Sequence, residues 1–411
     1  MSKPRHTDAI LNAFPVENGE LLIGGIPLSQ LANRVGQTPF YAYDRQKITA
    51  RVAHLRQHLP DEIHLHYAIK ANPMPAVVQH LAGLVDGFDL ASGGEMHVAL
   101  DTPMSSDHIS FAGPGKSERE IGSAIAAGVT LNLESETELE TAARLSEAQG
   151  IKARVAVRVN PDFELKSSGM KMGGGPKQFG IDAERVPAVL KRIGELDLDF
   201  QGFHIFSGSQ NLRPEAIIEA QEKTFELAYR LASGAPSTVK KLNIGGGFGI
   251  PYFPGEQPLD IAPIGDRLNE LLTEKDKQMP EAKVIIELGR YLVGEAGVYV
   301  CRIVDRKVSR EQVYLVADGG LHQHLAASGN FGQVIRKNYP TLIGNRMGET
   351  RTEQASIVGP LCTPLDLLAD KMELPMAGVG DLAVILQSGA YGYTASPHQF
   401  LSHPMPMEVV V

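Results

Sequence analysis

The chain has 411 residues, 43% of them hydrophobic, and a formal net charge of −9 at pH 7. This length favours two domains, and the apolar fraction is sufficient for large buried cores. The negative charge, without a long basic run, argues against nucleic acid as a partner. No apolar span reaches the roughly 20 residues of a membrane-spanning helix, so we expect a cytoplasmic protein that acts on a small molecule.

The N-terminal segment, residues 1–40, lacks the apolar core of a signal peptide, and its short strand-like run is expected to pair with a β domain later in the chain. The sequence then alternates short β-branched runs with longer amphipathic stretches, which predicts repeated βα units around a parallel sheet. Eight strands are predicted, at residues 64–69, 84–90, 108–111, 129–133, 154–159, 200–206, 240–244 and 283–286. This count predicts a (β/α)₈ barrel over residues 41–295, with the active site where the strands end.

After Gly294 the pattern changes, because residues 297–310, 311–318 and 381–389 are strand-like and helical periodicity becomes rare. A second domain with a β-sandwich or barrel-like fold is therefore predicted over residues 296–411. The glycine-rich stretch 167–181 is predicted to be a loop near the barrel mouth, whose glycines 173–175 close over substrate.

Residues that could take part in catalysis or ligand binding follow nearly every predicted strand. They are Lys70, Asp89, Ser92, Asn132, Arg158, Asn160, His204, Phe206, Gly245, Gly246, Gly247, Glu287 and Arg290. Because the carboxyl ends of parallel barrel strands meet at one rim, we expect these residues to converge there.

Lys70 ends an apolar strand, so partial desolvation should lower the pKa of its amine and allow it to attack an aldehyde. The alternative is a structural lysine that extends from a strand end to solvent. The turn Gly245 to Gly247 would let backbone amides approach a phosphate, although a plain tight turn remains the alternative. Glu287 ends a buried strand and suits a pyridinium nitrogen as its partner. A salt bridge to Arg290 is the other possibility, and Arg290 could instead clamp the phosphate.

Eight motifs, in order along nearly the whole chain, resemble those of the fold-type III decarboxylases that depend on pyridoxal 5′-phosphate (PLP). This family includes the diaminopimelate, ornithine and arginine decarboxylases. The motifs are YAIKANP, FDLASGGE, GFHIFSGSQ, NIGGGFG, ELGR, GPLCTPLD, GAYGY and the terminal HPMPMEVVV. The resemblance implies an amino-acid decarboxylase in which PLP binds to the barrel.

The resemblance also implies a role for each matching residue. Lys70 would hold PLP as a Schiff base, Glu287 would pair with the pyridine nitrogen, and Gly245 to Gly247 would hold the phosphate. Ser209 and Tyr391 would face the same phosphate. The full set of expected cofactor contacts is Lys70, Asp89, His204, Phe206, Ser209, Gly245, Gly246, Gly247, Glu287, Arg290 and Tyr391.

The resemblance further implies a head-to-tail homodimer in which Cys362 crosses the interface and protonates the product carbanion. The alternative is a buried cysteine with a purely structural role in packing. Cys301 is the only other cysteine, so no disulfide framework or cysteine-rich metal site is expected, and we predict no bound metal. The expected substrate contacts are Arg290, Cys362, Thr363, Asp366 and Tyr391.

Three positions depart from the family pattern. Phe206 replaces a histidine that stacks on the cofactor ring in relatives, and His204 could compensate because it lies on the same face of the strand. Thr363 replaces the acidic residue that holds the distal ammonium of diamino acids. Leu288 gives ELGR in place of EPGR. The second departure predicts a substrate other than a simple diamino acid, and the HIFSGSQ and SPHQFLSHP segments resemble exosortase-associated or siderophore-type branches.

Two other functions remain open from the sequence. An amino-acid racemase also joins a PLP barrel to a β domain. A catalytically silent relative could instead bind and regulate a true decarboxylase, although Lys70, Glu287, Cys362 and Tyr391 are all present.

Overall fold

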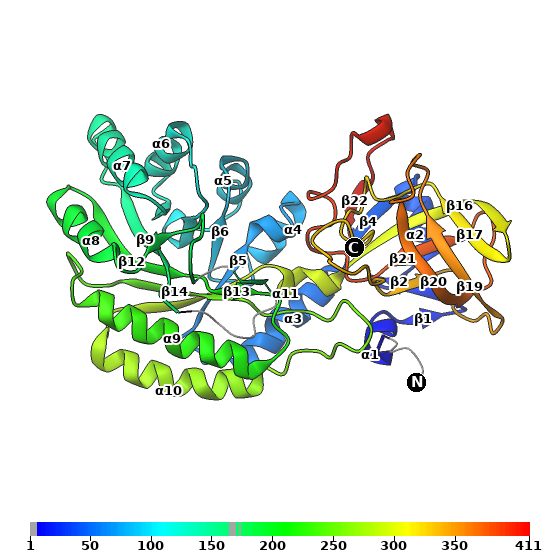
Figure 1. The fold of residues 1–411 in the computed structure, drawn as a ribbon, viewed down its shortest axis with the longest axis horizontal. Coiled ribbons are helices and arrows are strands. Elements are labelled where there is room, and N and C mark those ends of the chain that lie inside the picture. Colours follow the sequence, from blue (N-terminus) through cyan, green and yellow to red (C-terminus); the bar gives the residue numbers. More distant parts are fainter. Residues whose placement is uncertain (1–5, 164–169, 172–173) are drawn as a thin grey trace. The chain divides into compact units, whose positions relative to one another are not determined.

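A computed structural model describes residues 6–163, 170–171 and 174–411, which form two compact units (Figure 1). The first unit comprises Met1–Ala50, Pro251–Gln257 and Arg290–Val411, and the second comprises Arg51–Ile250 and Pro258–Gly289. The boundaries at 50/51 and 289/290 differ from the expected 40/41 and 295/296. The inclusion of Pro251–Gln257 in the first unit is not evident from the sequence.

The second unit is a closed parallel barrel, which confirms the predicted fold class. Its eight strands among the described residues are β5 (His64–Ala68), β6 (Gly87–Leu90), β7 (Ile109–Phe111), β8 (Thr130–Leu133), β9 (Arg154–Asn160), β12 (Asp199–Ile205), β14 (Lys241–Gly246) and β15 (Lys283–Leu288). Closure is complete because β15 pairs with β5 and β8 pairs with β9, both in parallel. The strands are buried on both faces, as expected for a parallel sheet covered by helices.

Helices alternate with these strands along the chain and surround the barrel (Figure 1). They are α3 (Arg45–His58), which begins in the first unit, α4 (Pro75–Leu81), α5 (Gly93–Leu100), α6 (Glu118–Ala127), α7 (Glu136–Gln149), α8 (Val186–Glu195), α9 (Pro214–Ala232) and α10 (Ala262–Gln278). Short 3₁₀ turns occur at η1 (Ile69–Ala71) and η2 (Ser106–His108), and short strands at β10 (Met170–Lys171), β11 (Ile181–Asp182) and β13 (Gly208–Ser209).

Local signals explain where several helices begin and end. Ser117 and Glu120 form a reciprocal capping box at the start of α6, which satisfies two backbone donors, and Gly128 ends the helix at φ +74°. Ser92 and Ser135 cap α5 and α7 by a single bond each, their hydroxyl oxygens accepting a backbone N–H three residues later. These caps place the strand ends that precede them at defined positions on the rim.

Strands outnumber helices in the first unit, which confirms the predicted β domain. Its described elements are α1 (Asp8–Leu11), β1 (Val16–Glu17), β2 (Glu20–Ile23), β3 (Ile26–Pro27), α2 (Leu28–Val35), β4 (Phe40–Tyr43), α11 (Arg290–Val293), η3 (Gly294–Ala296), β16 (Gly297–Ser309), β17 (Gln312–Ala317), β18 (Thr341–Ile343), β19 (Thr352–Val358), β20 (Leu367–Pro375), β21 (Leu382–Ile385), η4 (Phe400–Ser402) and β22 (Met407–Val410). Strand β4 pairs with both β16 and the C-terminal β22, whereas β2 forms a separate three-stranded sheet with β1 and β3.

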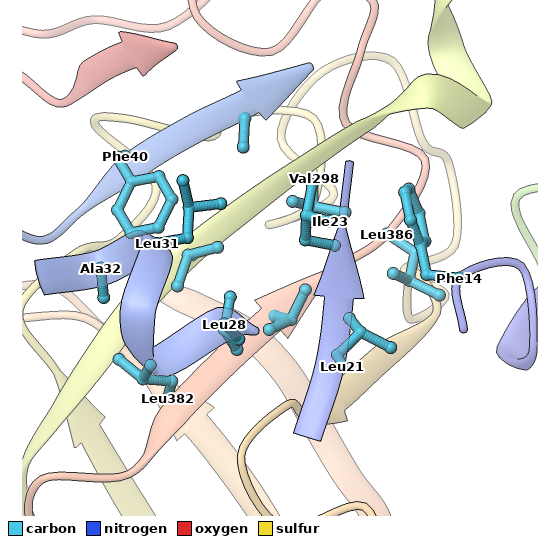
Figure 2. Close-up of a cluster of buried hydrophobic side chains, with 13 residues drawn as sticks. Phe14, Leu21, Ile23, Leu28, Leu31, Ala32, Phe40, Val298, Leu382 and Leu386 are labelled. Carbon is cyan, nitrogen blue, oxygen red and sulfur yellow. The ribbon is translucent and has the colours of Figure 1, made fainter. Parts of the chain in front are cut away.

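The core of the first unit is apolar and is built from segments far apart in sequence. Leu21 and Ile23 of β2 and Leu28 of α2 pack with Val298 of β16 and Leu382 of β21 (Figure 2). Burying each such side chain contributes roughly 1.5–3 kcal/mol. This core holds the strands from which the loops of the unit extend.

The glycine-rich stretch 167–181 falls partly outside the described residues. In its described part, the N–H of Gly174 donates to Asn160 Oδ1 at 3.1 Å, and Asn160 Nδ2 donates to the carbonyl of Gly175 at 2.9 Å. Asn160, a predicted site residue, therefore anchors this loop.

Candidate active site

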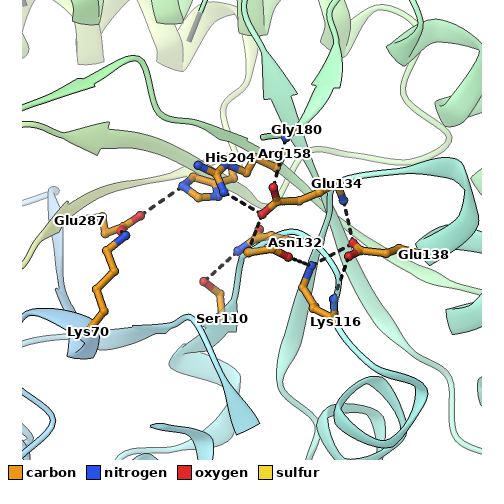
Figure 3. A network of polar contacts seen from close by, with 11 residues as sticks. Lys70, Ser110, Lys116, Asn132, Glu134, Glu138, Arg158, Gly180, His204 and Glu287 are labelled. Carbon is orange, nitrogen blue, oxygen red and sulfur yellow. Dashed lines mark hydrogen bonds and ion pairs between the residues drawn. The ribbon is translucent and has the colours of Figure 1, made fainter. Parts of the chain in front are cut away.

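Lys70, Glu287 and His204 meet at the carboxyl end of the barrel (Figure 3). Lys70 lies in the 3₁₀ turn η1 directly after β5, and its Nζ is 3.6 Å from Glu287 Oε1. The other carboxylate oxygen, Oε2, is 3.1 Å from His204 Nε2. Strands β5, β12 and β15 thus bring together three residues that the sequence predicted separately.

Glu287 is buried, but it lies beside cationic and hydrogen-bonding groups. Burial favours the neutral acid, yet the charge of Lys70 and then the hydrogen bond from His204 hold the pKa of Glu287 well below its ordinary value. The Lys70 side chain is 41% exposed, whereas the Glu287 side chain is 6% exposed. The site therefore presents an accessible amine beside a buried carboxylate that stays ionised.

Phe206 and the glycine turn lie next to this pair. The Phe206 ring centroid is 5.6 Å from Lys70 Nζ, whereas His204 is engaged with Glu287. A Cβ at Gly245 would lie 2.8 Å from Phe206 Cδ2, and one at Gly246 would lie 2.1 Å from the carbonyl oxygen of Glu287. Only glycine allows such close backbone approach, and Gly245 also has φ +69°.

These residues fit PLP. His204 Nδ1 is buried without a hydrogen-bond partner among the described residues, as is Arg290 Nε, so each retains unused polar capacity. Gly247, at φ +79°, passes so close to Gly208 that a Cβ would lie 2.6 Å from its carbonyl oxygen. The turn and Ser209, which follows Gly208, form a narrow backbone cradle suited to a phosphate.

Asp89 and Asn132 face the barrel interior. Asp89 Oδ2 lies 3.3 Å from His66 Nδ1, and Asp89 Oδ1 accepts the hydroxyl of Ser110. Asn132 Nδ2 donates to the same Ser110 hydroxyl at 3.1 Å. The contacts of Asp89 are thus with the interior of the barrel rather than with Lys70 or Glu287.

Arg158 belongs to a buried ion pair that the sequence analysis missed. Its Nη1 donates to Glu134 Oε1 at 2.7 Å, and Glu134 Oε2 accepts the N–H of Gly180 at 3.1 Å (Figure 3). Lys116 belongs to the same network, because its Nζ lies 2.9 Å from Glu138 Oε2. The position of Glu134 directly after β8 was the available signal, because a carboxylate at a strand end needs a partner when buried.

Glu95 is a second residue that was overlooked. It accepts the N–H of Ala91 at 2.7 Å within the helix cap of α5. Burial raises the pKa of Glu95, while Lys70 lowers it, so the two side chains are electrostatically linked. In the sequence, Glu95 is indistinguishable from an ordinary capping glutamate.

Arg290 and Tyr391 come together in the first unit. The guanidinium of Arg290 lies 4.6 Å from the ring centroid of Tyr391, and its Nη1 donates to the Tyr252 hydroxyl at 3.0 Å. Tyr391 has φ +52°, an uncommon conformation for a tyrosine, which indicates that its surroundings fix its position. Burial would lower the pKa of Arg290, but Tyr252 and Tyr391 raise it overall, so the residue is a fixed cation.

Cys362 is exposed on the loop between β19 and β20. Asp366 anchors this loop, because its carboxylate accepts the N–H groups of Leu321 at 2.6 Å and Leu361 at 2.9 Å. Thr363 Oγ1 accepts the N–H of Leu365 at 3.3 Å. Asp366 therefore positions the loop, whereas Cys362 is the side chain that the loop presents.

Cys301 differs from Cys362 in every relevant respect. It lies fully buried in β16, and burial raises the pKa of its thiol well above the ordinary value. A buried neutral thiol is a packing group. Of the two cysteines, only Cys362 is accessible for chemistry.

Comparison with known proteins gives consistent matches. Residues 45–294 match the family described as pyridoxal-dependent decarboxylase, pyridoxal binding domain. The chain is 38% identical to L-glutamyl-[BtrI acyl-carrier protein] decarboxylase of Niallia circulans over 384 residues, which cover 91% of this chain and 89% of that protein. It is 29% identical to 2-[(L-alanin-3-ylcarbamoyl)methyl]-2-hydroxybutanedioate decarboxylase of Staphylococcus aureus over 372 residues, covering 89% and 92%.

Among solved structures, the chain resembles diaminopimelate decarboxylase from M. jannaschii in complex with L-lysine, with a TM-score of 0.88 and 25% identity. The superposition covers 98% of this chain and 93% of that one. The similar structure and the similar sequences cover nearly the full length of the chain, and the family match covers residues 45–294.

Proposed function

Because this chain belongs to the fold-type III PLP-dependent decarboxylases, it is an enzyme that uses PLP to remove the α-carboxylate of an amino acid, and we propose that Lys70 and Glu287 carry this chemistry. The main support is the accessible Lys70 amine, 3.6 Å from a buried and ionised Glu287. The matched family and the similar proteins are decarboxylases, so no observation favours the racemase or the silent regulator.

Each residue near this pair has a proposed task. Lys70 would hold the cofactor covalently, and Glu287 would keep the pyridine nitrogen protonated. His204 would orient Glu287, and Phe206 would pack on the cofactor ring, which its position near Lys70 supports. When bound, PLP supplies an electron sink for the electrons left by the departing carboxylate.

In the barrel unit, the phosphate would be held by backbone amides and a serine hydroxyl. Gly245 to Gly247 and Ser209 form the cradle in the barrel. As the resemblance implies, Tyr391 and Arg290 would add a hydroxyl and a positive charge, and the unused Arg290 Nε supports an anionic partner. For Asp89, Ser110 donates to Oδ1, but Oδ2 is buried without a hydrogen-bond partner among the described residues, which supports its place among the cofactor contacts.

Cys362 would return a proton to the product carbon. It is exposed and sits on a loop that Asp366 holds in place. The resemblance implies that it acts in the site of a second copy, so we propose a homodimer. Exposed apolar side chains support such an interface. Leu365 of this loop is 59% exposed, and Asn330 Nδ2 donates to its carbonyl at 3.3 Å. The segment that follows Asn330 carries Phe331, Val334 and Ile335, exposed by 48%, 100% and 77%.

A mixture of two inactive variants tests this arrangement. Lys70→Ala and Cys362→Ala are each expected to decarboxylate poorly, but their mixture should regain activity after subunit exchange. If subunits reassort randomly, half of the dimers are mixed and each has one intact site, which gives about one quarter of wild-type activity. The measurement is CO₂ release against mixing ratio, and a mixture no more active than its components would exclude a shared site.

For the substrate, we propose an amino acid whose distal end is held as an acyl group on a carrier protein. Thr363 follows Cys362 where diamino-acid decarboxylases have an acidic residue, so a distal ammonium would lack its counter-charge. The similar protein of Niallia circulans acts on L-glutamyl-[BtrI acyl-carrier protein], and that of Staphylococcus aureus also acts on a conjugated amino acid. Both substrates fit a pocket that does not recognise a free amine at the distal end of the amino acid.

A panel of substrates with ¹³C-labelled α-carboxylates tests this proposal. The PLP-loaded enzyme is expected to release labelled CO₂ from glutamate attached to an acyl-carrier protein, measured by mass spectrometry. Free glutamate, lysine, ornithine and meso-diaminopimelate serve as controls for the carrier and for the distal ammonium. Faster release from a free diamino acid than from any conjugate would contradict the proposal.

We further propose that the enzyme works in the cytoplasm. None of the helices in the described parts of the chain has the length and apolar character needed to cross a bilayer. Both cysteines are free thiols, which suits a reducing compartment.

A further inference from the structure

A second cavity lies at the end of the barrel opposite to Lys70. It has a volume of about 270 Å³ and is lined by residues at the beginnings of strands, including His64 of β5, Arg154 of β9, Lys241 of β14 and Lys283 of β15. Parallel strands all begin at one end of a barrel and terminate at the other, where the active site forms. This cavity is therefore separate from the site formed by Lys70 and Glu287.

The lining of this cavity has an excess of positive charge. The cations are Arg154, Lys240, Lys241 and Lys283, the carboxylates are Asp107 and Glu281, and the histidines are His64, His66 and His108. Four cations against two carboxylates leave a positive excess before any histidine is protonated. Cavities of one charge sign concentrate ligands of the opposite sign.

Two of the four cations are already neutralised by neighbouring carboxylates. Arg154 forms an ion pair with Asp107, and Lys240 Nζ lies 2.7 Å from Asp199 Oδ1. Within the described ranges, no carboxylate lies within ion-pair distance of Lys241 or Lys283. These two ammonium groups are therefore the cations of the cavity that form no ion pair among the described residues.

The position of Lys241 is electrostatically unfavourable. Burial, and then the nearby charge of Arg154, lower the pKa of Lys241 to about 8. Lys283 acts in the same direction, and the more distant carboxylates Asp89 and Asp199 offset these effects only in part. Its Nζ does donate to the carbonyl oxygen of Asp107 at 2.5 Å, but a neutral acceptor compensates a cation only in part. An anion in the cavity would relieve both the burial and the repulsion.

A larger cavity on the barrel surface provides a contrast, because the cations that line it do have carboxylate partners. That cavity, of about 640 Å³, lies between α7 and α8 and is also rich in charged side chains. There, Lys152 Nζ is 2.6 Å from Asp197 Oδ1, and Arg192 Nε is 2.7 Å from Glu140 Oε1. Because these cations already form ion pairs within the protein, the cavity has no unpaired positive charge that would favour an anion.

We propose that the cavity at the strand beginnings binds a compact multivalent oxyanion, with Lys241 and Lys283 as its principal ligands. The histidines that line the same cavity, among them His64 and His108, can add hydrogen bonds. A volume below the about 300–1,000 Å³ of ordinary small-molecule pockets favours a compact ion over a nucleotide. Nothing in the proposed decarboxylase chemistry requires this site, so it points to an effector or a regulatory ion.

Calorimetric titration of the PLP-loaded enzyme with inorganic pyrophosphate tests the proposal at constant ionic strength. We expect saturable binding of one ion per chain, with the PLP absorbance unchanged. Lys241→Gln and Lys283→Gln should each weaken binding by about tenfold to a hundredfold, because each removes a charge-assisted hydrogen bond. Lys152→Gln, in the balanced cavity, is the matched control and should bind as the wild type does.

Thermal unfolding separates a ligand site from a structural lysine. Pyrophosphate should raise the Tm of the wild type and of Lys152→Gln, but not that of the double variant Lys241→Gln/Lys283→Gln. Without the anion, Lys241→Gln should leave the Tm unchanged or higher. The proposal would be overturned if both lysine variants bound pyrophosphate as tightly as the wild type does. It would also be overturned if Lys152→Gln lost as much affinity as they do. Lys283 is the more exposed of the two lysines, so Lys283→Gln allows the test even if Lys241→Gln folds poorly.

Discussion

The Lys70→Ala enzyme is expected to decarboxylate at less than about one thousandth of the wild-type rate, because it loses both the amine that holds the cofactor and a proton-transfer group. In the wild type, borohydride reduction should fix the mass of reduced PLP on the peptide that contains Lys70. In the variant this adduct should be absent. Mass spectrometry of the digested protein measures both outcomes together with the rate of CO₂ release.

Two further substitutions show whether the effect belongs to Lys70 itself. Lys70→Arg keeps a cation next to Glu287 but cannot form the imine, so it should be as inactive as Lys70→Ala. Lys223→Ala removes a surface lysine of α9 that pairs with Glu219 at 2.6 Å, and it should retain full activity. An active Lys70→Ala enzyme with PLP trapped on another lysine would assign the role elsewhere.

The Glu287→Gln enzyme should lose about a hundredfold to a thousandfold in kcat, which is the size of effect seen when one preorganised electrostatic group is removed from an active site. Glutamine can still accept a hydrogen bond from His204, but it cannot keep a pyridine nitrogen protonated. The variant should therefore still bind PLP covalently through Lys70, as shown by borohydride trapping. Glu287→Asp keeps the charge and should retain more activity, and a Glu287→Gln enzyme with normal kcat would remove Glu287 from the mechanism.

The low pKa of Glu287 adds a dependence on pH. Burial opposes ionisation, but Lys70 and His204 lower the pKa of this carboxyl below its ordinary value of about 4.3. A group whose pKa is lower in the folded state stabilises the fold above its unfolded pKa, and that contribution is lost as pH falls through the folded pKa. The difference in unfolding free energy between the wild type and Glu287→Gln should therefore decrease below about pH 4.

The barrel was predictable because its signals are local. Each strand is a short apolar run buried on both faces, and each helix carries its own period and cap, as Ser117 and Glu120 show for α6. The β domain was predicted less completely, since β19 and β20 were not identified. Their exposed and buried residues do not alternate regularly, so strand periodicity is weak there.

The sequence by itself determined the order of strands and the residues that end them, because β-branched runs, glycine turns and capping residues act over a few neighbouring positions. From this order and the family motifs, the chemistry of Lys70, Glu287 and Cys362 could be predicted. Only the tertiary structure decided the partners: Glu287 pairs with Lys70 and His204, and Arg158 with Glu134. It also decided that Lys241 and Lys283 lack carboxylate partners among the described residues. The physical reason is that barrel closure brings side chains from distant strands within 4 Å, and electrostatic pairing at that range depends on distances that no local pattern contains.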